Sequence, residues 1–243
     1  MKQMRFRDET GEIRTGEFNN GSVVTDGGER DPETIDVLPP VEPSKVLGVA
    51  HNYRSHFADS DDQIPDRPTL WWKGGHTVVA SHGDTIELPA VDNVIYEAEI
   101  GVVIGTRCRN VSRSNAQDVI AGFTCVNDLS NRDDQEIEQN WVRGKAFDGA
   151  APMGPVVATP DEVPDDARVS LRVNGETKQD SSREHLIFPV PELIEEITTY
   201  LTLEPGDVIA TGTPEGVGPL SDGDDVEVDI EGVGTLEHSV RIP

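Results

Sequence analysis

Two glutamates, Glu97 and Glu99, lie within an apolar run that extends from Val94 to Ile104. Because side chains alternate faces along a strand, we expect both carboxylates on one face, about 7 Å apart. Burying an unpaired carboxylate costs several kcal/mol, so a positive group should lie between the two. A divalent cation is the leading candidate for that group.

The spacing of these two acids carries little information by itself. The chain has 46 acidic residues among 243, and at that density two acids separated by one residue are expected about nine times by chance. The apolar context distinguishes this pair. Others, such as Asp222 and Asp224, lie in polar surroundings typical of a solvated face.

Asp128 is the natural third ligand, because it ends a second apolar run that begins near Phe123. It follows Glu97 closely enough in sequence for the two strands to be neighbours. Three carboxylates with no cysteine or clustered histidine favour Mg²⁺, Mn²⁺ or Ca²⁺ over zinc. The alternative is that Asp128 caps the helix expected after it.

A histidine and an aspartate offer a candidate general base. If the segment after Ala50 turns helical, His56 and Asp59 share a face because they are three residues apart. An acid beside an imidazole fixes its tautomer and raises its basicity, as a base working near neutral pH requires. In so acidic a chain, the competing interpretation is a chance pair on the surface.

Polar and cationic side chains supply three more candidates. Arg132 and Gln135 fall three apart on an expected helix, and Arg132 could hold a substrate carboxylate through two hydrogen bonds or form a surface ion pair. Lys145 lies between a glycine and apolar residues, where a lysine either extends to solvent or serves as a point charge in a site.

Thr213 belongs to a glycine-rich loop that follows the apolar run 207–210. This loop lacks the Gly-Lys-Ser/Thr sequence of a nucleotide-binding loop, so phosphate binding is not supported. Its hydroxyl and backbone N–H groups could still bind a carboxylate.

The elements that must position these residues are mainly strands. Short apolar runs divided by Gly, Pro and Asp-Gly turns predict strands over 46–50, 77–80, 95–104, 123–127, 154–158, 169–173, 207–210, 225–230 and 236–242. Helices are expected only over 114–121, 131–140 and 190–201. In the last, Pro191 fits a first turn, and the apolar stripe comprises Leu193, Ile194, Ile197, Tyr200 and Leu201. The pattern predicts a mainly β fold with a few helices, closer to a barrel or folded sheet than to a βαβ array.

The N-terminal residues are expected to form a separate small β unit. Strands over 4–7 and 12–17 flank a polar turn at 9–11, and 21–24 adds a third strand. Three prolines at positions 39, 40 and 43 then interrupt regular structure. We therefore expect a small domain with a proline-rich linker over 1–43 and a catalytic domain over 44–243.

Composition narrows the class of protein. The net charge is −26, with the acids spread along the whole length and only five lysines, a pattern typical of proteins adapted to high salt. The alternative, an acidic protein with a basic partner, would more naturally show a clustered patch. The sequence has no stripe of basic residues, which argues against nucleic-acid binding. It also has no apolar run of the length that a signal peptide or a membrane span requires. Cys108 and Cys125 are expected to be free buried thiols in the cytoplasm.

Taken together and in this order, six segments of the chain resemble the fumarylacetoacetate hydrolase family, in its smaller acylpyruvase-like and hydroxymuconate-isomerase-like branch. The resemblance runs from about Lys45 to Ile242, and the first 40 or so residues look like the small β domain that some members carry. The segments are Asn52-Tyr53-Arg54-Ser55-His56, Tyr96-Glu97-Ala98-Glu99, Asn127-Asp128-Leu129-Ser130-Asn131-Arg132-Asp133, Arg143-Gly144-Lys145-Ala146-Phe147-Asp148, residues 203–218 and Glu231-Gly232-Val233-Gly234.

The resemblance implies a mixed β-roll of the fumarylacetoacetase C-terminal type, assembled as a homodimer around a Mg²⁺ or Mn²⁺ site. By position, Glu97, Glu99 and Asp128 match the metal ligands, His56 the catalytic histidine, and Lys145 the lysine that stabilises developing negative charge. Three further residues match positions that contact substrate oxygens: Arg132, Gln135 and Thr213. The family commonly has glutamate where this chain has Asp59, the expected partner of His56.

For function, the resemblance implies a hydrolase that cleaves a C–C bond in an acylpyruvate-like or fumarylacetoacetate-like diketo acid. The alternative is an isomerase, decarboxylase or dehydratase of 2-hydroxy-diene or 2-oxo acids from aromatic or sugar-acid degradation, through the same metal–enolate chemistry. A third hypothesis, of a different class, is a metal-bound binding protein for small acids that has no turnover.

Overall fold

The computed structural model describes residues 1–57, 64–91 and 93–243. Among the residues predicted to act in the site, Asp59 lies outside these ranges.

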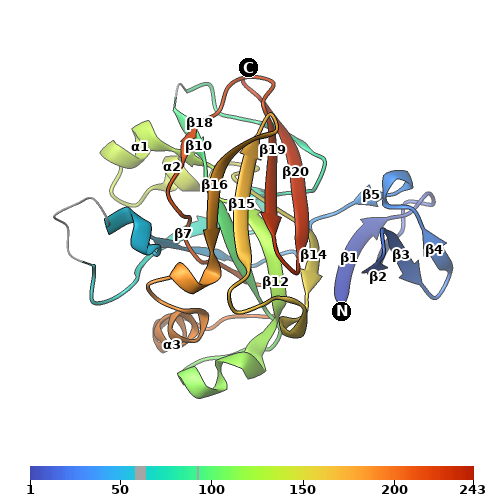
Figure 1. Ribbon diagram of the computed structural model, residues 1–243, viewed down its shortest axis with the longest axis horizontal. Coiled ribbons are helices and arrows are strands. Elements are labelled where there is room, and N and C mark those ends of the chain that lie inside the picture. The colour runs from blue at the N-terminus through green and yellow to red at the C-terminus, as the bar shows by residue number, and fades with distance from the viewer. Residues whose placement is uncertain (58–63, 92) are drawn as a thin grey trace.

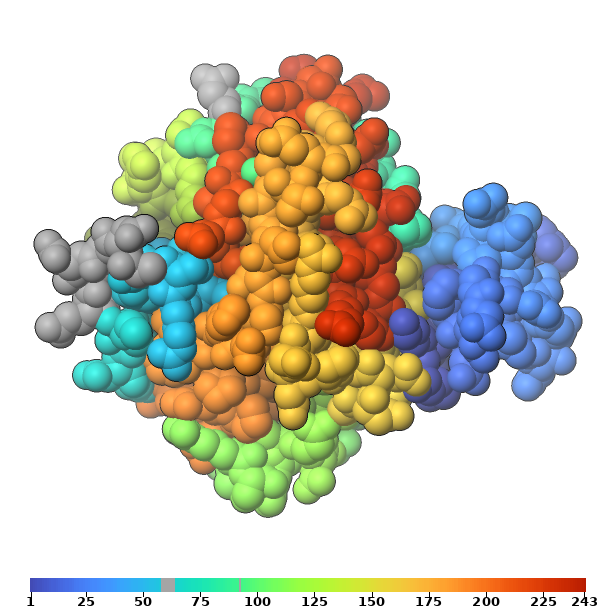
Figure 2. Space-filling model, viewed as in Figure 1, coloured from blue at the N-terminus to red at the C-terminus, as the bar shows by residue number. Residues whose placement is uncertain are grey.

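The first strands form an antiparallel unit that projects from one side of the molecule (Figures 1 and 2). They are β1 (Lys2–Arg7), β2 (Ile13–Asn19), β3 (Ser22–Thr25), β4 (Gly28–Arg30) and β5 (Asp36–Val37), with one 3-10 turn, η1 (Pro32–Thr34). The three strands predicted here are confirmed. Lys2 and Gln3 pair with Ala158 and Val157 of the main sheet, so the unit continues that sheet. The division into two domains at residue 43 stays a prediction.

In the described part of the chain, a 12-stranded sheet forms the largest layer. Its remaining strands are β6 (Val46–Ala50), β7 (Thr69–Gly74), β8 (Val79–Ala80), β11 (Ala98–Ile104), β12 (Ile120–Asn127), β14 (Ala151–Ala158) and β17 (Val208–Ala210). The order is β4-β3-β2-β1-β14-β12-β11-β17-β6-β7, with β5 on β1 and β8 on β14. Pairing is antiparallel except between β17 and β6 and between β14 and β8.

Two smaller sheets complete the β structure. One has the order β16-β15-β19-β20-β9, formed by β9 (Thr85–Glu87), β15 (Arg168–Val173), β16 (Glu176–Ser182), β19 (Asp225–Ile230) and β20 (Gly234–Arg241). The other comprises β10 (Val94–Tyr96), β13 (Ser130–Asn131) and β18 (Gly218–Pro219). In Figure 1 the strands β15, β19 and β20 lie across β12 and β14. Buried side chains of both sheets, including Ile100, Phe123, Leu171 and Val228, form one core between them.

Short helices close the ends of the sheets: α1 (Arg132–Ile137), α2 (Val142–Lys145) and α3 (Val190–Tyr200), with 3-10 turns η2 (Arg54–Phe57), η3 (His76–Val78), η4 (Arg113–Val119), η5 (Pro160–Glu162) and η6 (Arg183–His185). Residues Leu193, Ile194 and Ile197 of α3 are buried as predicted, but Tyr200 is 58% exposed, so that part of the predicted stripe is wrong. Tyr200 instead accepts a hydrogen bond from Arg67 at the surface. No helix in the described ranges is both long enough and apolar enough to cross a membrane.

The prediction of a mainly β fold with a few helices is confirmed, with three local differences. The strand predicted over 77–80 is wrong in its first half, because His76–Val78 form the 3-10 turn η3 and only Val79–Ala80 form a strand, β8. The run 95–104 is not one strand, because β10 ends at Tyr96 and β11 begins at Ala98. The predicted helix 114–121 is a 3-10 helix, η4, that packs beside α3.

Candidate metal centre and active site

The three predicted acids meet at one point, where β10, β11 and β12 end or begin. Glu97 lies in the break between β10 and β11, Glu99 is in β11, and Asp128 follows β12 directly. Ala98 pairs with Asn127, so the two strands bring the acids together as expected from the sequence. One carboxylate oxygen from each acid lies within 4.8 Å of the others, and all three side chains are buried.

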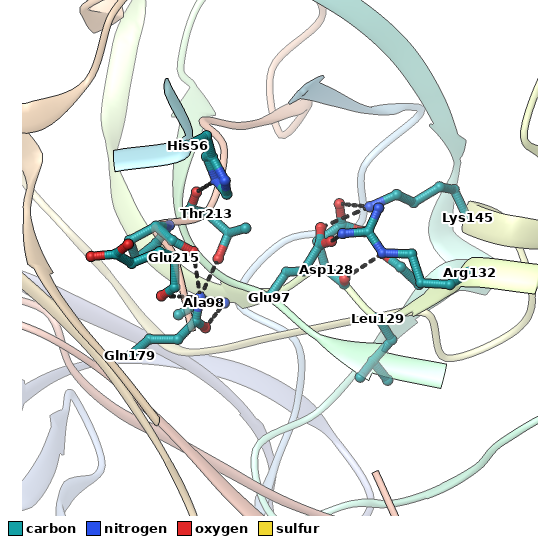
Figure 3. Close-up of polar contacts among 12 residues, drawn as sticks. His56, Glu97, Ala98, Asp128, Leu129, Arg132, Lys145, Gln179, Thr213 and Glu215 are labelled. Carbon is teal, nitrogen blue, oxygen red and sulfur yellow. Dashed lines mark hydrogen bonds and ion pairs between the residues drawn. The ribbon is translucent and has the colours of Figure 1, made fainter. Parts of the chain in front are cut away.

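Two buried lysines and one arginine contact the acids. Figure 3 shows Lys145 and Arg132 directed at Glu97 and Asp128. Lys145 Nζ lies 2.8 Å from Glu97 Oε2 and 2.6 Å from Asp128 Oδ2. Lys73 Nζ pairs with Asp128 Oδ1 and donates to the carbonyl of Leu129 at 2.9 Å. Arg132 Nη2 donates to Glu97 Oε1 at 3.0 Å. Asp128 therefore caps no helix, and Asn131 instead caps α1 by accepting from the Asp134 N–H.

Glu99 has a different environment from the other two acids. Its Oε2 accepts a hydrogen bond from the Gly212 N–H at 2.9 Å. Burial, with the Asp128 and Glu97 carboxylates adding to it, raises the pKa of Glu99 well above its usual value. Burial also tends to raise the pKa of Asp128, but Lys145 and Lys73 overcome that effect and lower it. Asp128 is therefore held as a carboxylate, whereas at Glu99 the attraction of Lys145 does not offset burial and the two neighbouring carboxylates.

The donor set fits a hard divalent cation. All three candidate ligands are carboxylates, which Mg²⁺ and Mn²⁺ prefer over the thiolates and imidazoles of typical zinc sites. Each carboxylate oxygen has two lone-pair directions, so an oxygen that accepts from Lys145 can also bind a cation. A cation at this point would offset the burial and the repulsion that together raise the pKa of Glu99. Glu97, Glu99 and Asp128 are thus the residues that would hold the metal.

A cavity of about 220 Å³ opens over the acids and contains every described site residue predicted from the sequence: His56, Glu97, Glu99, Asp128, Arg132, Gln135, Lys145 and Thr213. The acids and Lys145 form its buried part, and the exposed His51 and Glu136 lie at its edge. The structure brings these eight residues together, while their roles in binding and catalysis stay predictions.

His56 lies on η2, at the side of the cavity opposite Lys145 (Figure 3). Its Nε2 is 2.7 Å from the carbonyl oxygen of Thr213. A carbonyl can only accept, so we assign the proton of the neutral ring to Nε2 and leave Nδ1 as the basic nitrogen. The predicted pairing of His56 with Asp59 lies outside the described residues.

Arg132 and Gln135 share the face of α1 that lines the cavity, as their spacing predicted. Gln135 Oε1 is buried and has no hydrogen-bond partner in the described structure, so a donor on a bound ligand could satisfy it. Gly144 of α2 makes room for this side chain, because a Cβ there would lie 2.5 Å from Gln135 Cγ.

Two residues of β7 that contact the site, Lys73 and Trp71, were not predicted from the sequence. Lys73 is fully buried, and burial lowers its pKa to about 8 despite the attraction of Asp128. The Trp71 ring lies beside both ammonium groups. Its centroid is 4.5 Å from Lys145 Nζ and 5.3 Å from Lys73 Nζ. The detectable signal was the same as for Lys145, a lysine within an apolar run, here following two tryptophans.

Backbone strain marks the edge of the cavity. His51 and Trp141, which both line it, have φ values of 52° and 55°. This left-handed conformation is unfavourable for bulky side chains and is concentrated at functional sites in proteins. The strain supports the identification of this cavity as the functional site.

Comparison with known proteins gives the same result for the family. A sequence model of the fumarylacetoacetate (FAA) hydrolase C-terminal region matches residues 45–241. A protein of Archaeoglobus fulgidus is 44% identical over 94% of this chain and 92% of its own length. An oxaloacetate tautomerase of Bacillus subtilis is 38% identical over 82% of this chain and 70% of its own length.

Solved structures share the whole fold, including the N-terminal unit. A 5-carboxymethyl-2-hydroxymuconate delta-isomerase from Mycobacterium smegmatis has a TM-score of 0.91 and 34% identity, covering 100% of this chain and 99% of that one. A maleylpyruvate hydrolase from Sphingobium, solved with manganese(II) and pyruvate, has a TM-score of 0.84 and 27% identity, covering 100% and 99%. The β-roll expected from the resemblance is therefore confirmed, and the chain belongs to the fumarylacetoacetate hydrolase family.

Proposed function

We propose that this protein is a divalent-metal-dependent enzyme that interconverts the keto and enol forms of a small 2-oxo acid. The observation that carries the proposal is the buried group of Glu97, Glu99 and Asp128, with Lys145 against it, inside a cavity that also contains His56. Enolates of 2-oxo acids need positive charge at two neighbouring oxygens, and this cavity concentrates positive groups around a cation site.

The chain's own residues divide the work as follows. A bound Mg²⁺ or Mn²⁺ would supply Lewis-acid polarisation of the chelated oxo acid. Arg132 binds the carboxylate of the substrate, and Lys145 stabilises negative charge on the enolate oxygen. His56, through Nδ1, takes the proton from the carbon next to the ketone, and a proton returned to the oxygen completes the enol. The Thr213 carbonyl, which accepts from Nε2–H, orients the ring, and the predicted pairing with Asp59 would require Asp59 to take the place of that carbonyl.

Isomerisation is preferred for two reasons. It needs only the transfer of one proton from carbon to oxygen. In addition, the Bacillus subtilis relative is named an oxaloacetate tautomerase, and the Mycobacterium smegmatis structure is named a delta-isomerase. The sequence alone had favoured hydrolysis of a C–C bond. That remains the second candidate, supported by the likeness to a maleylpyruvate hydrolase. Hydrolysis would need the same enolate stabilisation, and in addition His56 would have to deprotonate a water.

The test is a panel of oxaloacetate, acylpyruvates, fumarylacetoacetate and 2-hydroxymuconate-type acids, assayed with Mn²⁺ or Mg²⁺ and with products identified by NMR. We expect rapid keto–enol exchange of at least one acid without loss of carbon. His56→Ala should lower the rate by about 10²-fold or more and leave Mn²⁺ affinity unchanged. His185→Ala, which removes an exposed imidazole on η6, is the matched control.

Cleavage products without faster exchange would replace the isomerase proposal with the hydrolase one. Full activity of His56→Ala would exclude His56 as the proton carrier. Metal binding without turnover of any acid would support the third hypothesis, a binding protein.

A further inference from the structure

Gln179 of β16 connects the metal-binding segment to the Thr213 loop, although it lies outside the cavity wall. The side chain is 1% exposed. Its Oε1 accepts from the Ala98 N–H at 2.9 Å, next to Glu97. Its Nε2 donates to Thr213 Oγ1 at 2.8 Å and to the Pro214 carbonyl at 2.8 Å (Figure 3).

The two backbone partners fix the orientation of the Gln179 amide. The Ala98 N–H can only donate, so it requires the amide oxygen, and the Pro214 carbonyl can only accept, so it requires the amide nitrogen. Thr213 Oγ1 must therefore accept a hydrogen bond from Gln179. Its own proton then points elsewhere, and within the described residues no protein acceptor receives it.

Other contacts also fix the backbone of the loop around Thr213, so the direction of the Thr213 hydroxyl proton depends on Gln179. The Gly212 N–H donates to Glu99, and the Thr213 carbonyl accepts from His56. Gly216 lies against β16, because a Cβ there would be 2.1 Å from the Lys178 carbonyl oxygen. Thr213 is thus fixed between a candidate metal ligand, the candidate base and Gln179, and it lines the cavity.

We propose that Gln179 is a positioning residue that makes the Thr213 hydroxyl a hydrogen-bond donor into the cavity, and thereby selects ligands that present an acceptor oxygen there, such as a carboxylate or ketone oxygen. This inference rests on the proposed function, because it takes the ligand to be an oxo acid and assigns Thr213 as the donor in one hydrogen bond to it. A neutral threonine free to rotate would accept or donate equally, so the selectivity comes from Gln179 rather than from Thr213 alone.

The experiment is a double-mutant cycle on pyruvate affinity, measured by calorimetry on the Mn²⁺-loaded protein. The variants are Gln179→Met, Thr213→Val and the double variant, with Thr213→Ser as the conservative change and Gln117→Met on the exposed η4 as the matched control. Thr213→Val should weaken pyruvate binding about tenfold, as expected for loss of a hydrogen bond to a charged group. Gln179→Met should weaken it about threefold, because the Thr213 hydroxyl remains but is free to turn away from the ligand. The double variant should be no weaker than Thr213→Val, because Gln179 acts only through that hydroxyl.

Thr213→Ser and Gln117→Met should bind pyruvate as the wild type does, and Mn²⁺ affinity measured without pyruvate should stay within about threefold in every variant. A loss of about thirtyfold or more in the double variant would overturn the proposal, since it would show two independent effects. So would wild-type pyruvate affinity in Gln179→Met. If Gln179→Met does not fold, equal pyruvate affinities of Thr213→Val and Thr213→Ser would overturn it instead.

Pyruvate binding does not require turnover, so the two proposals fail separately. If the variants show the predicted pyruvate affinities but the wild type does not accelerate keto–enol exchange, the proposed function is contradicted and the role of Gln179 is supported. A wild-type protein that binds Mn²⁺ but no pyruvate would count against both.

Discussion

At the scale of single residues, the backbone at Glu97 is held by two side-chain amides and one backbone hydrogen bond, because the strand is interrupted there. Its N–H donates to Asn127 Oδ1 at 2.9 Å, its carbonyl accepts from the Asp128 N–H at 2.8 Å, and the next N–H, of Ala98, donates to Gln179. These contacts satisfy the backbone where the strand is interrupted. A candidate metal ligand can therefore leave the regular strand without an unpaired buried amide.

His238 supports this arrangement from β20. Its Nε2 is 2.9 Å from Asn127 Nδ2, and because Asn127 Oδ1 is already directed at the Glu97 N–H, Nδ2 must donate to an unprotonated Nε2. Burial lowers the pKa of His238 to about 4. The folded protein thus holds His238 neutral at pH values where an unfolded chain, with an ordinary pKa of about 6.5, is protonated.

The sign of the pH effect follows from this difference. As the pH falls from about 6.5 to about 4, the unfolded state binds a proton that the folded state does not, so stability is lost by up to about 3 kcal/mol and then levels off. We expect His238→Gln, whose amide oxygen can still accept from Asn127, to lose correspondingly less stability over the same range. Urea denaturation at a series of pH values measures both slopes. Parallel slopes for the two proteins would show that His238 does not contribute.

At the scale of elements, the loop after β17 joins the candidate metal ligands, the candidate base and Gln179. Gly216 allows this loop to touch β16, with φ of +96° and no space for a Cβ beside the Lys178 carbonyl. Gly223 is a matched control, since its φ is +81° and a Cβ there would meet nothing within 4 Å. Both glycines therefore have a left-handed backbone conformation, but only Gly216 is confined by a neighbouring strand.

Gly223→Ala should lose about 1–2 kcal/mol of stability, the usual cost of a left-handed alanine. Gly216→Ala should lose more, and it should also weaken pyruvate binding to the Mn²⁺-loaded protein, because the loop that carries Thr213 must move away from β16. Thermal unfolding and calorimetry measure the two effects. Equal losses in both variants, with pyruvate affinity intact in each, would mean that the loop does not depend on its contact with β16.

The strands that could be predicted from the sequence were those with an apolar face. Residues 46–50 and 225–230 were predicted with the bounds that β6 and β19 have, and the runs that end in Glu99 and Asp128 were sufficient to predict the metal centre. The strand β16 could not be found in this way. Its sequence, Glu176–Ser182, contains no large apolar residue, and among the described strands it pairs with β15 alone, at the edge of its sheet.

Site residues could be predicted where a reactive or charged side chain lay within a recognisable local sequence motif. Lys145 and Thr213 were identified through motifs, whereas Gln179 carries no such signal, because a single glutamine in a polar strand resembles a surface residue. Its importance arises from contacts with residues 98 and 213, far away in sequence. Long-range contacts of this kind depend on the register of β16 on β15, which sequence periodicity does not determine.

At the scale of the whole molecule, the net charge of −26 predicts a dependence on salt. Self-repulsion of a dispersed acidic surface is screened within about 10 Å at 0.1 M salt and more strongly at molar salt. We expect the far-ultraviolet circular dichroism signal of the folded protein to be lost when KCl is removed and to be restored by KCl, but not by sorbitol at equal osmolality. A signal that is independent of KCl would contradict adaptation to high salt.

The homodimer and the cytoplasmic location also stay predictions.

The proposed chemistry requires that Glu97, Glu99 and Asp128 bind one divalent cation within the cavity. The most direct test is an anomalous difference map from crystals grown with Mn²⁺ in excess. We predict one strong peak within about 2.0–2.3 Å of an oxygen from each of the three acids. A map with no peak at this position, in which Lys73 and Lys145 remain the only positive groups in contact with Asp128, would contradict the account.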